Sequence, residues 1–350
     1  RGRVALGRYL KHDGAVEFEL LEPAPGELTF RFAGQADQRV AWAEDGAFRV
    51  AWKWGRPLFR RQVGEGDRET LVENGVHAFH LMLPPAPPQL SEEQLHVFKD
   101  VGALLVHEAV PAAVCRAALE CGAVQEILRE AAGKRVHSAH CSAPEIAALA
   151  APLWPEVCRI VGGDLPLPSS AQIAVRGICG SPTPPGSVPG GVHVDGMHAP
   201  GNGVPSGEVR PFTLLLGVAL TDVTHSHLVG NFSYIPGSHK ALARAAARKA
   251  SLEEAVDALR VYEADAPMGG VRRFKRRLGV DCRRLAPPAH ICCGVGGAYL
   301  AHYLTLHFVQ PNCAGVVPRV AAYFRVTAPI RKWPECFLEQ HLFDEMPGLP

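Results

Sequence analysis

The sequence has almost no net charge, and this absence limits the partners that it predicts. Its 350 residues include 36 Lys and Arg against 35 Asp and Glu, which leaves a formal net charge of +1. A chain so close to neutrality has no general attraction to the phosphates of nucleic acid or to an anionic membrane surface. We therefore expect no nucleic-acid partner, while the oligomeric state stays open.

Long hydrophobic runs, repeats and Cys-x-x-Cys pairs are also missing. No apolar stretch approaches the roughly 20 residues that a bilayer-spanning helix needs, so no membrane association is expected. The ten cysteines are scattered, which favours free thiols in a reducing compartment over a disulfide framework. We expect an intracellular, cytoplasmic protein. Organelle targeting stays open, because the chain begins at Arg1 rather than at a methionine.

Changes in composition and in hydrophobic pattern along the chain predict its domain organisation. Residues 1–82 alternate apolar and polar residues around turn signals such as EDG, which predicts a small β-rich region whose role stays open. Residues 83–90 (LPPAPPQL) indicate a proline-rich linker. Residues 91–335 then predict the main domain, and residues 336–350 a C-terminal tail.

Helices precede strands within the main domain. Ser91, followed by two glutamates, predicts a helix start. Further helices are expected over 111–132, over 143–161 with proline interruptions, and over 240–264. Strands are expected from about residue 170, in the segments 170–178, 191–195, 210–223, 229–240, 296–309 and 317–328.

His193 and Asp195, in the stretch GVHVDG, are the first candidate site residues. Residues two apart on a strand point to the same face, so both side chains project together if this segment is extended. One imidazole and one carboxylate supply two ligands of the facial triad that holds Fe(II) and leaves the opposite positions open. A structural hydrogen-bonded pair is the alternative interpretation.

The third ligand is expected from His302 or His307. Their odd spacing would place them on opposite faces of one regular strand, so only one of them reaches the metal. Arg319 favours His307, because it follows that histidine by twelve residues after a proline-marked turn. Its guanidinium can clamp a carboxylate with two parallel hydrogen bonds, as the far end of 2-oxoglutarate requires.

Other residues are weaker candidates. Thr213 is considered for cosubstrate binding or for lining the pocket, and His198 for contact with substrate. Arg176, in an apolar strand, needs a partner, which is either a substrate acid or a carboxylate of the chain. Arg325 and His239 are expected to be structural. A basic segment within 271–284 is interpreted as a solvated helix face, or else as a site for an anionic substrate such as a CoA thioester or a phosphate; it contains Arg272, Arg273, Lys275, Arg276 and Arg277.

Four segments in order resemble the phytanoyl-CoA hydroxylase-like group of Fe(II)/2-oxoglutarate-dependent dioxygenases. Together they cover about residues 90–330 and read LSEEQLHVFKDVGALLVHEAVP, HVDG, VGNFSYIPGSHK and HFVQPNCAGVVPRVAAYFR. The resemblance implies a mainly β fold with flanking helices, a double-stranded β-helix of the jelly-roll, cupin-like class. It also implies an insertion at about 240–290. Gly297 and Val309 depart from the pattern, since many relatives have an acid and a small polar residue there.

The same resemblance implies a chemistry. His193, Asp195 and His307 would bind Fe(II), and Arg319 would bind 2-oxoglutarate. The reaction would use O2 to hydroxylate a small organic substrate, acyl or anionic in character, with release of succinate and CO2 and with ascorbate in support. Related halogenases have a small residue in place of Asp195, so its presence favours hydroxylation.

Two alternatives remain beside this interpretation. One is a hydroxylase that acts on a protein side chain or a nucleobase. The other is a catalytically inactive jelly-roll that serves as a binding module. The complete triad and Arg319 argue against the inactive module, and turnover of the cosubstrate distinguishes the two classes.

Overall fold

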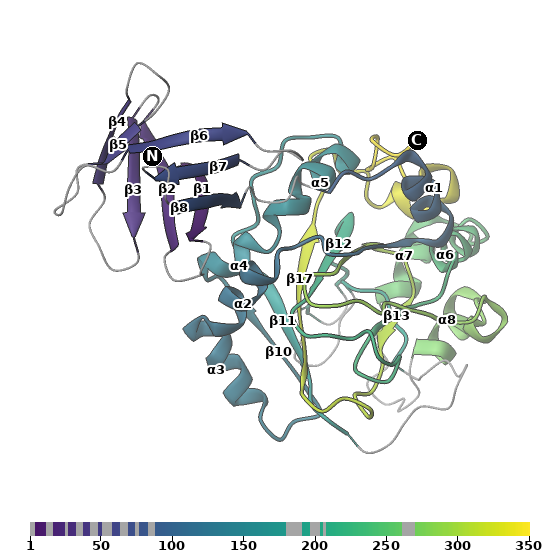
Figure 1. The fold of residues 1–350 in the computed structure, drawn as a ribbon. Helices are drawn as coiled ribbons and strands as arrows, with labels where there is room; N and C mark the ends of the chain where they lie inside the picture. The colour runs from purple at the N-terminus through teal and green to yellow at the C-terminus, as the bar shows by residue number, and fades with distance from the viewer. Residues whose placement is uncertain are drawn as a thin grey trace. The chain divides into compact units, whose positions relative to one another are not determined.

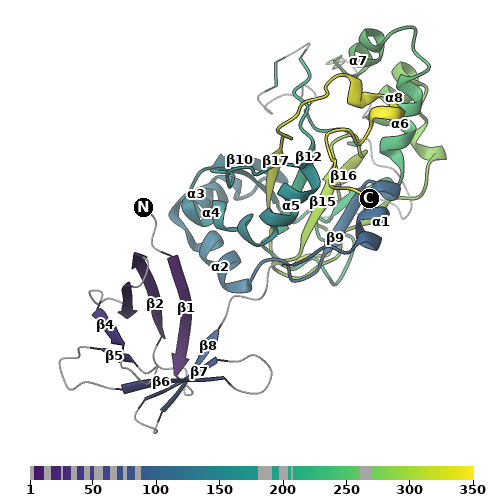
Figure 2. The same cartoon turned by 90° about the horizontal axis from the view of Figure 1, so that it is seen from above.

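A computed structural model gives the fold of the chain in two units, Arg1–Ala86 and Pro87–Pro350 (Figures 1 and 2). It describes eight strands within residues 4–82, and then residues 88–179, 191–196, 204–205, 208–260 and 270–350. For the eight strands, and for 259–260 and 270–273, it describes the backbone alone. The division between the units falls inside the segment that the sequence predicts as a linker.

The first unit is a closed barrel of antiparallel strands, drawn in purple in Figure 1. Each strand pairs with the next, and β1 pairs with β8 to close the barrel. A closed barrel has no unpaired sheet edge. Its strands are β1 (Val4–Lys11), β2 (Glu17–Ala24), β3 (Glu27–Phe32), β4 (Gln38–Trp42), β5 (Phe48–Val50), β6 (Leu58–Val63), β7 (Glu69–Glu73) and β8 (His77–Met82).

The second unit is built on a six-stranded antiparallel sheet, the major sheet. Its central strand β12 is buried along its whole length, as expected for an apolar strand covered on both faces. In spatial order the strands are β10 (Val136–Cys141), β11 (Ala171–Arg176), β17 (Arg319–Val326), β12 (Leu214–Ala219), β15 (Ala298–His302) and β9 (Ala103–Val106).

A smaller sheet, the minor sheet, faces the major sheet. Its strands are, in spatial order, β14 (Ala289–His290), β13 (Phe232–Tyr234) and β16 (His307–Val309). An antiparallel bridge between His193 and His307 adds the segment around His193 at its edge. From β11 to β17 the chain passes back and forth between the two sheets. This is the strand order of a double-stranded β-helix, so the predicted jelly-roll fold class is confirmed.

The pleat of the major sheet divides the core into two parts. On β17, Val320, Ala322 and Phe324 point to the outer face, while Ala321 and Tyr323 point to the inner face. The outer face packs on the helices drawn in dark blue to teal in Figure 1. These are α1 (Glu92–Val101), α2 (Ala112–Glu120), α3 (Gly122–Ala131), α4 (Pro144–Ala148), η1 (Ala151–Leu153) and α5 (Trp154–Val161).

Among the described residues after β13, the chain forms three further helices and three short 3-10 turns. Buried residues of the helices, such as Leu242, Ala255 and Phe274, join the inner part of the core. The residues predicted as a C-terminal tail also pack there through Phe337 and Leu342. The elements are α6 (Ser238–Ala246), α7 (Leu252–Arg260), α8 (Gly270–Leu278), η2 (Cys282–Arg284), η3 (Glu335–Phe337) and η4 (Glu339–His341).

Local signals account for where several elements begin. Ser91 caps α1: its hydroxyl accepts from the Gln94 amide, and the Gln94 side chain accepts from the Ser91 amide. The helix expected over 111–132 is instead two helices, because the backbone at Cys121 is extended. None of the described helices combines the length and hydropathy that a membrane crossing demands.

The segment expected as one strand over 296–309 is also two elements. β15 ends at His302 in the major sheet, and β16 begins at His307 in the minor sheet. The opposite-face argument for the two histidines is therefore wrong in its premise, because they do not share a strand. Their side chains are separated by the turn between the sheets.

His302 lies in the core as a neutral ring. Its Nε2 donates to the Leu342 carbonyl at 3.1 Å, and its Nδ1 accepts from the Leu304 amide at 3.2 Å. Burial and the nearby His239 lower the pKa of His302 to about 3. A second proton on Nδ1 would face the Leu304 amide donor, so protonation breaks this arrangement.

This ring predicts a loss of stability in acid. In the unfolded chain the pKa of His302 is about 6.5, so below that pH the unfolded chain binds a proton that the folded ring does not. The free energy of unfolding therefore falls as the pH falls from about 6.5 toward the pKa of the folded ring. From about pH 7 to pH 5, His302 accounts for roughly 2 kcal/mol of that loss. Urea unfolding at both pH values should therefore show a smaller loss in His302→Asn than in wild type.

The exposed His96 on α1 supplies the control. His96→Asn should leave the difference between the two pH values as it is in wild type. An unchanged difference in His302→Asn would contradict the assignment of a buried neutral ring.

Candidate metal centre

His193 and His307 are brought together by backbone pairing. Each amide donates to the carbonyl of the other at 3.0 Å, as in a hydrogen-bonded antiparallel pair. Their ring centroids lie 4.4 Å apart. Asp195 follows His193 by two residues and points to the same side, as the alternation of a strand predicts. The structure therefore brings together three residues that sequence analysis names as ligands.

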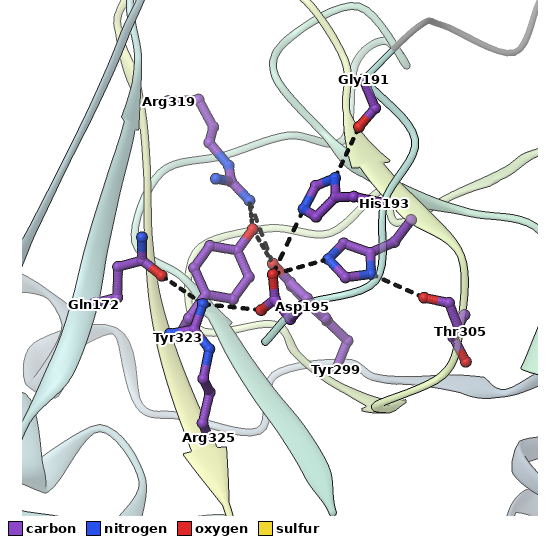
Figure 3. A network of polar contacts seen from close by, with 10 residues as sticks. Gln172, Gly191, His193, Asp195, Tyr299, Thr305, Arg319, Tyr323 and Arg325 are labelled. Carbon is purple, nitrogen blue, oxygen red and sulfur yellow. Dashed lines mark hydrogen bonds and ion pairs between the residues drawn. The ribbon is translucent and has the colours of Figure 1, made fainter. Parts of the chain in front are cut away.

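The three side chains converge on one point. Figure 3 labels His193 and Asp195 there. Oδ1 of Asp195 lies 3.5 Å from Nε2 of His193 and 3.6 Å from Nε2 of His307. The three ligand atoms all lie within 4.8 Å of one another. Such separations are too long for good hydrogen bonds but suit three ligands on one face of a metal ion.

The outer nitrogens of the two rings fix their tautomers. Nδ1 of His193 lies 2.7 Å from the Gly191 carbonyl, and Nδ1 of His307 lies 2.9 Å from the Thr305 carbonyl. A carbonyl oxygen can only accept, so each Nδ1 carries the proton and each Nε2 keeps a lone pair. Three lone-pair atoms thus face one another without a proton between them, an arrangement that a cation stabilises.

The second oxygen of Asp195 is held by Arg325. Nη2 of Arg325 donates to Oδ2 at 2.9 Å and to Oε1 of Gln172 at 2.8 Å (Figure 3). Burial alone would raise the pKa of Asp195, but the charge of Arg325 holds it well below its usual value. Asp195 is therefore an ionised carboxylate that presents Oδ1 to the histidines.

Arg319 lies on the same face of β17 and is 4% exposed. Its Nη2 donates to the hydroxyls of Tyr323, at 2.8 Å, and Tyr299, at 3.3 Å. Its Nη1 is buried and has no hydrogen-bond partner among the described residues. Burying half of a guanidinium fork without an acceptor is costly, so Nη1 is suited to donate to an anionic ligand.

A close approach between strands places Tyr299. A side-chain carbon at Gly217, its partner on β12, would lie 2.3 Å from the Tyr299 ring. Only glycine leaves this space open. Gly217 thereby lets the Tyr299 hydroxyl reach Tyr323 at 2.9 Å and Arg319 beyond it.

Gln172, Tyr299 and Tyr323 were not predicted from the sequence, and Arg325 was expected to be structural. The missed signal was the period of two along β17, which places Arg319, Tyr323 and Arg325 on one face. Arg319 is buried on this face, where a charge without a partner is expensive, whereas Arg325 is exposed and paired with Asp195.

The remaining candidates have different surroundings. Arg176 lies directly opposite Arg319 in the pairing of β11 with β17. Thr213 is not brought to the triad: its hydroxyl donates to Glu345 at 2.5 Å and accepts from the Ala328 amide. The proposed cosubstrate role of Thr213 thus gives way to a link with the C-terminal residues. His198 lies outside the described residues, and so do the side chains of Arg272 and Arg273.

Gly297 and Val309, which depart from the pattern of the family that the sequence resembles, lie among the described residues. A side-chain carbon at Gly297 would lie 2.5 Å from Cβ of Cys293, so this turn has no room for an acidic side chain. Val309 ends β16 and is partly buried. Neither residue provides a ligand atom to the triad.

Comparison with known proteins gives similarity to solved structures only. No protein-family model matches the chain, and no curated protein matches it. The carbocyclase SnoK from nogalamycin biosynthesis, described as a non-heme α-ketoglutarate-dependent enzyme, is 19% identical over 69% of this chain and 85% of its own, with a TM-score of 0.44.

Two other similar structures come from Streptomyces. HygX from Streptomyces hygroscopicus, with nickel and 2-oxoglutarate bound, is 16% identical over 70% of this chain and 90% of its own, with a TM-score of 0.41. AviO1 from Streptomyces viridochromogenes Tue57 is 17% identical over 69% of this chain and 99% of its own, with a TM-score of 0.41. At such scores, the chain's own residues must carry any functional assignment.

The geometry predicts that a divalent metal binds at His193, Asp195 and His307. His307→Gln should weaken binding of Mn²⁺ by more than the ~10–100-fold that loss of an outer partner costs, because a ligand itself is removed. Titration followed by electron paramagnetic resonance of free Mn²⁺ measures this directly.

A matched histidine variant controls for surface effects. His140→Gln changes an exposed histidine of β10 and should retain wild-type affinity. Equal Mn²⁺ affinity in wild type and His307→Gln would rule out this metal centre.

Proposed function

We propose that this chain is an Fe(II)- and 2-oxoglutarate-dependent dioxygenase that hydroxylates a small organic molecule and releases succinate and CO2. One observation carries the proposal. Two imidazole nitrogens and one carboxylate oxygen, all lacking a proton, converge within 4.8 Å on the inner side of a jelly-roll. Beside them lies a buried arginine with half of its fork unused.

The donor set fits iron. Two neutral imidazoles and one carboxylate are the facial set that suits Fe(II) and leaves three positions for other ligands. Arg325 ties up Oδ2 of Asp195, so this carboxylate offers a single oxygen to the metal. When bound, iron would supply the activation of O2, with 2-oxoglutarate as the source of two of the electrons.

Arg319 fits the distal carboxylate of 2-oxoglutarate. Its Nη2 is oriented by two tyrosine hydroxyls, and its Nη1 remains to donate to an acceptor. The Tyr323 hydroxyl accepts from both Tyr299 and Arg319, so its own proton is free to donate to the same carboxylate. A guanidinium and a phenol would thus hold one end of the cosubstrate.

Asp195 also bears on the type of reaction. Halogenases that resemble this family have a small residue at the corresponding position, which leaves room for a halide. The carboxylate of Asp195 fills that position here, and this supports hydroxylation. A protein side chain or a nucleobase as the substrate would keep the same iron chemistry, and a substrate screen separates those possibilities.

Succinate formation tests the proposal. Wild-type protein with Fe(II), ascorbate, 2-oxoglutarate and air should form succinate even without substrate, because uncoupled turnover is slow but measurable in such enzymes. Asp195→Ala should abolish succinate formation, since it removes a ligand. Arg319→Ala should raise the KM for 2-oxoglutarate at least ~10-fold, as expected for a lost charge-assisted pair.

The control is Arg129→Ala, which removes an exposed arginine of α3. It should turn over like wild type. If wild type forms no succinate under any of these conditions, the chain is better explained as a jelly-roll binding module.

A further inference from the structure

A second arginine lies beside Arg319 on the inner face of the major sheet. Arg176 is its direct partner in the register of β11 with β17. On β11 the inner face carries Gln172, Ala174 and Arg176: Gln172 reaches Arg325, and Ala174 packs in the inner core. Alternation along the strand therefore directs Arg176 to the side of the sheet that carries the triad.

Gly230 shows how close the two arginines lie. A side-chain carbon built there would lie 3.0 Å from Cβ of Arg319 and 3.2 Å from Cβ of Arg176. The loop before β13 therefore lies against both side chains at their base. Its glycine, with φ of 81°, has a backbone conformation that other residues rarely adopt.

The two like charges have no neutralising acid. Among the described residues, no carboxylate forms an ion pair with Arg176 or Arg319, and the side chain of Arg176 has no hydrogen-bond partner. Burial and the charge of Arg319 both lower the pKa of Arg176, which agrees with an unshielded pair of cations. A partly buried guanidinium beside another one is unfavourable unless an anion joins it.

The two arginines differ in access. Arg319 is buried and already oriented by two tyrosine hydroxyls, whereas Arg176 is partly exposed and has its whole fork available. A deep, preorganised site suits a cosubstrate that is the same in every cycle. A more open site suits a group on the molecule that is to be modified.

We propose that Arg176 binds a carboxylate group of the primary substrate, and that this enzyme therefore acts on small carboxylic acids. The planar fork of a single guanidinium matches one carboxylate with two parallel hydrogen bonds. A phosphate would call for more donors, and the nearest guanidinium is already oriented toward the cosubstrate. Only the identification of the anion as part of the substrate rests on the proposed function. Anion binding at Arg176 rests on the position of this side chain beside Arg319.

The test compares a carboxylate with its neutral counterpart. Binding of para-trifluoromethylbenzoate and of para-trifluoromethylbenzamide to the metal-free protein is followed by fluorine NMR. Wild type should bind the acid at least about tenfold more tightly than the amide, in line with the strength of a charge-assisted pair. Arg176→Gln should remove that preference, and Arg176→Lys should retain part of it.

Arg135→Gln is the matched control, because Arg135 is an exposed arginine just before β10, the strand beside β11. It should keep the wild-type preference for the acid. The proposal is overturned if acid and amide bind equally to wild type, or if the preference survives in Arg176→Gln. It is also overturned if Arg176→Gln weakens 2-oxoglutarate binding tenfold, since Arg176 would then belong to the cosubstrate site.

The two proposals can fail separately. The fluorine NMR measurement needs neither iron nor turnover, so a preference for the acid that depends on Arg176 survives a failed succinate assay. Conversely, normal succinate formation with no acid preference keeps the dioxygenase and removes the carboxylate-bearing substrate.

Discussion

The backbone pairing of His193 with His307 is the contact on which the site depends. It joins the short segment around His193 to β16 of the minor sheet, and it places two imidazoles 4.4 Å apart. Because the pairing is made by backbone groups, it holds the ligands without using their side chains. The local carbonyls of Gly191 and Thr305 then set both tautomers, so each ring presents a lone pair to Asp195.

The pleat of the major sheet separates its two faces, and the inner face carries the arginines of the site. One face of β17 packs on helices through Val320, Ala322 and Phe324. This packing leaves the other face to carry polar side chains of the site. Arg325 on that inner face orients Asp195, and Arg319 is held by tyrosine hydroxyls. A buried charge such as that of Arg319 is costly, so its presence in this register indicates an anion that it binds.

Local patterns in the sequence predicted much of the site and fold. His193 and Asp195 followed from a period of two, and the apolar segment of β12 from burial on both faces. The end of β15 at His302 and the start of β16 at His307 were not predicted, because they depend on the closure of two sheets. The contact of Arg325 with Gln172 spans 153 residues and that of Thr213 with Glu345 spans 132, so neither contact was predicted. Strand register, which a single sequence does not contain, decides these contacts.

The central claim is that His193, Asp195 and His307 hold iron beside a 2-oxoglutarate site at Arg319. Its most direct test is the absorbance of the anaerobic protein on addition of Fe(II) and then 2-oxoglutarate. The account predicts a charge-transfer band near ~500 nm that requires both additions, as a chelated metal–cosubstrate complex gives. The band should be absent in Asp195→Ala. If wild type shows no band at saturating iron and cosubstrate, the three residues form a structural cluster and the account is wrong.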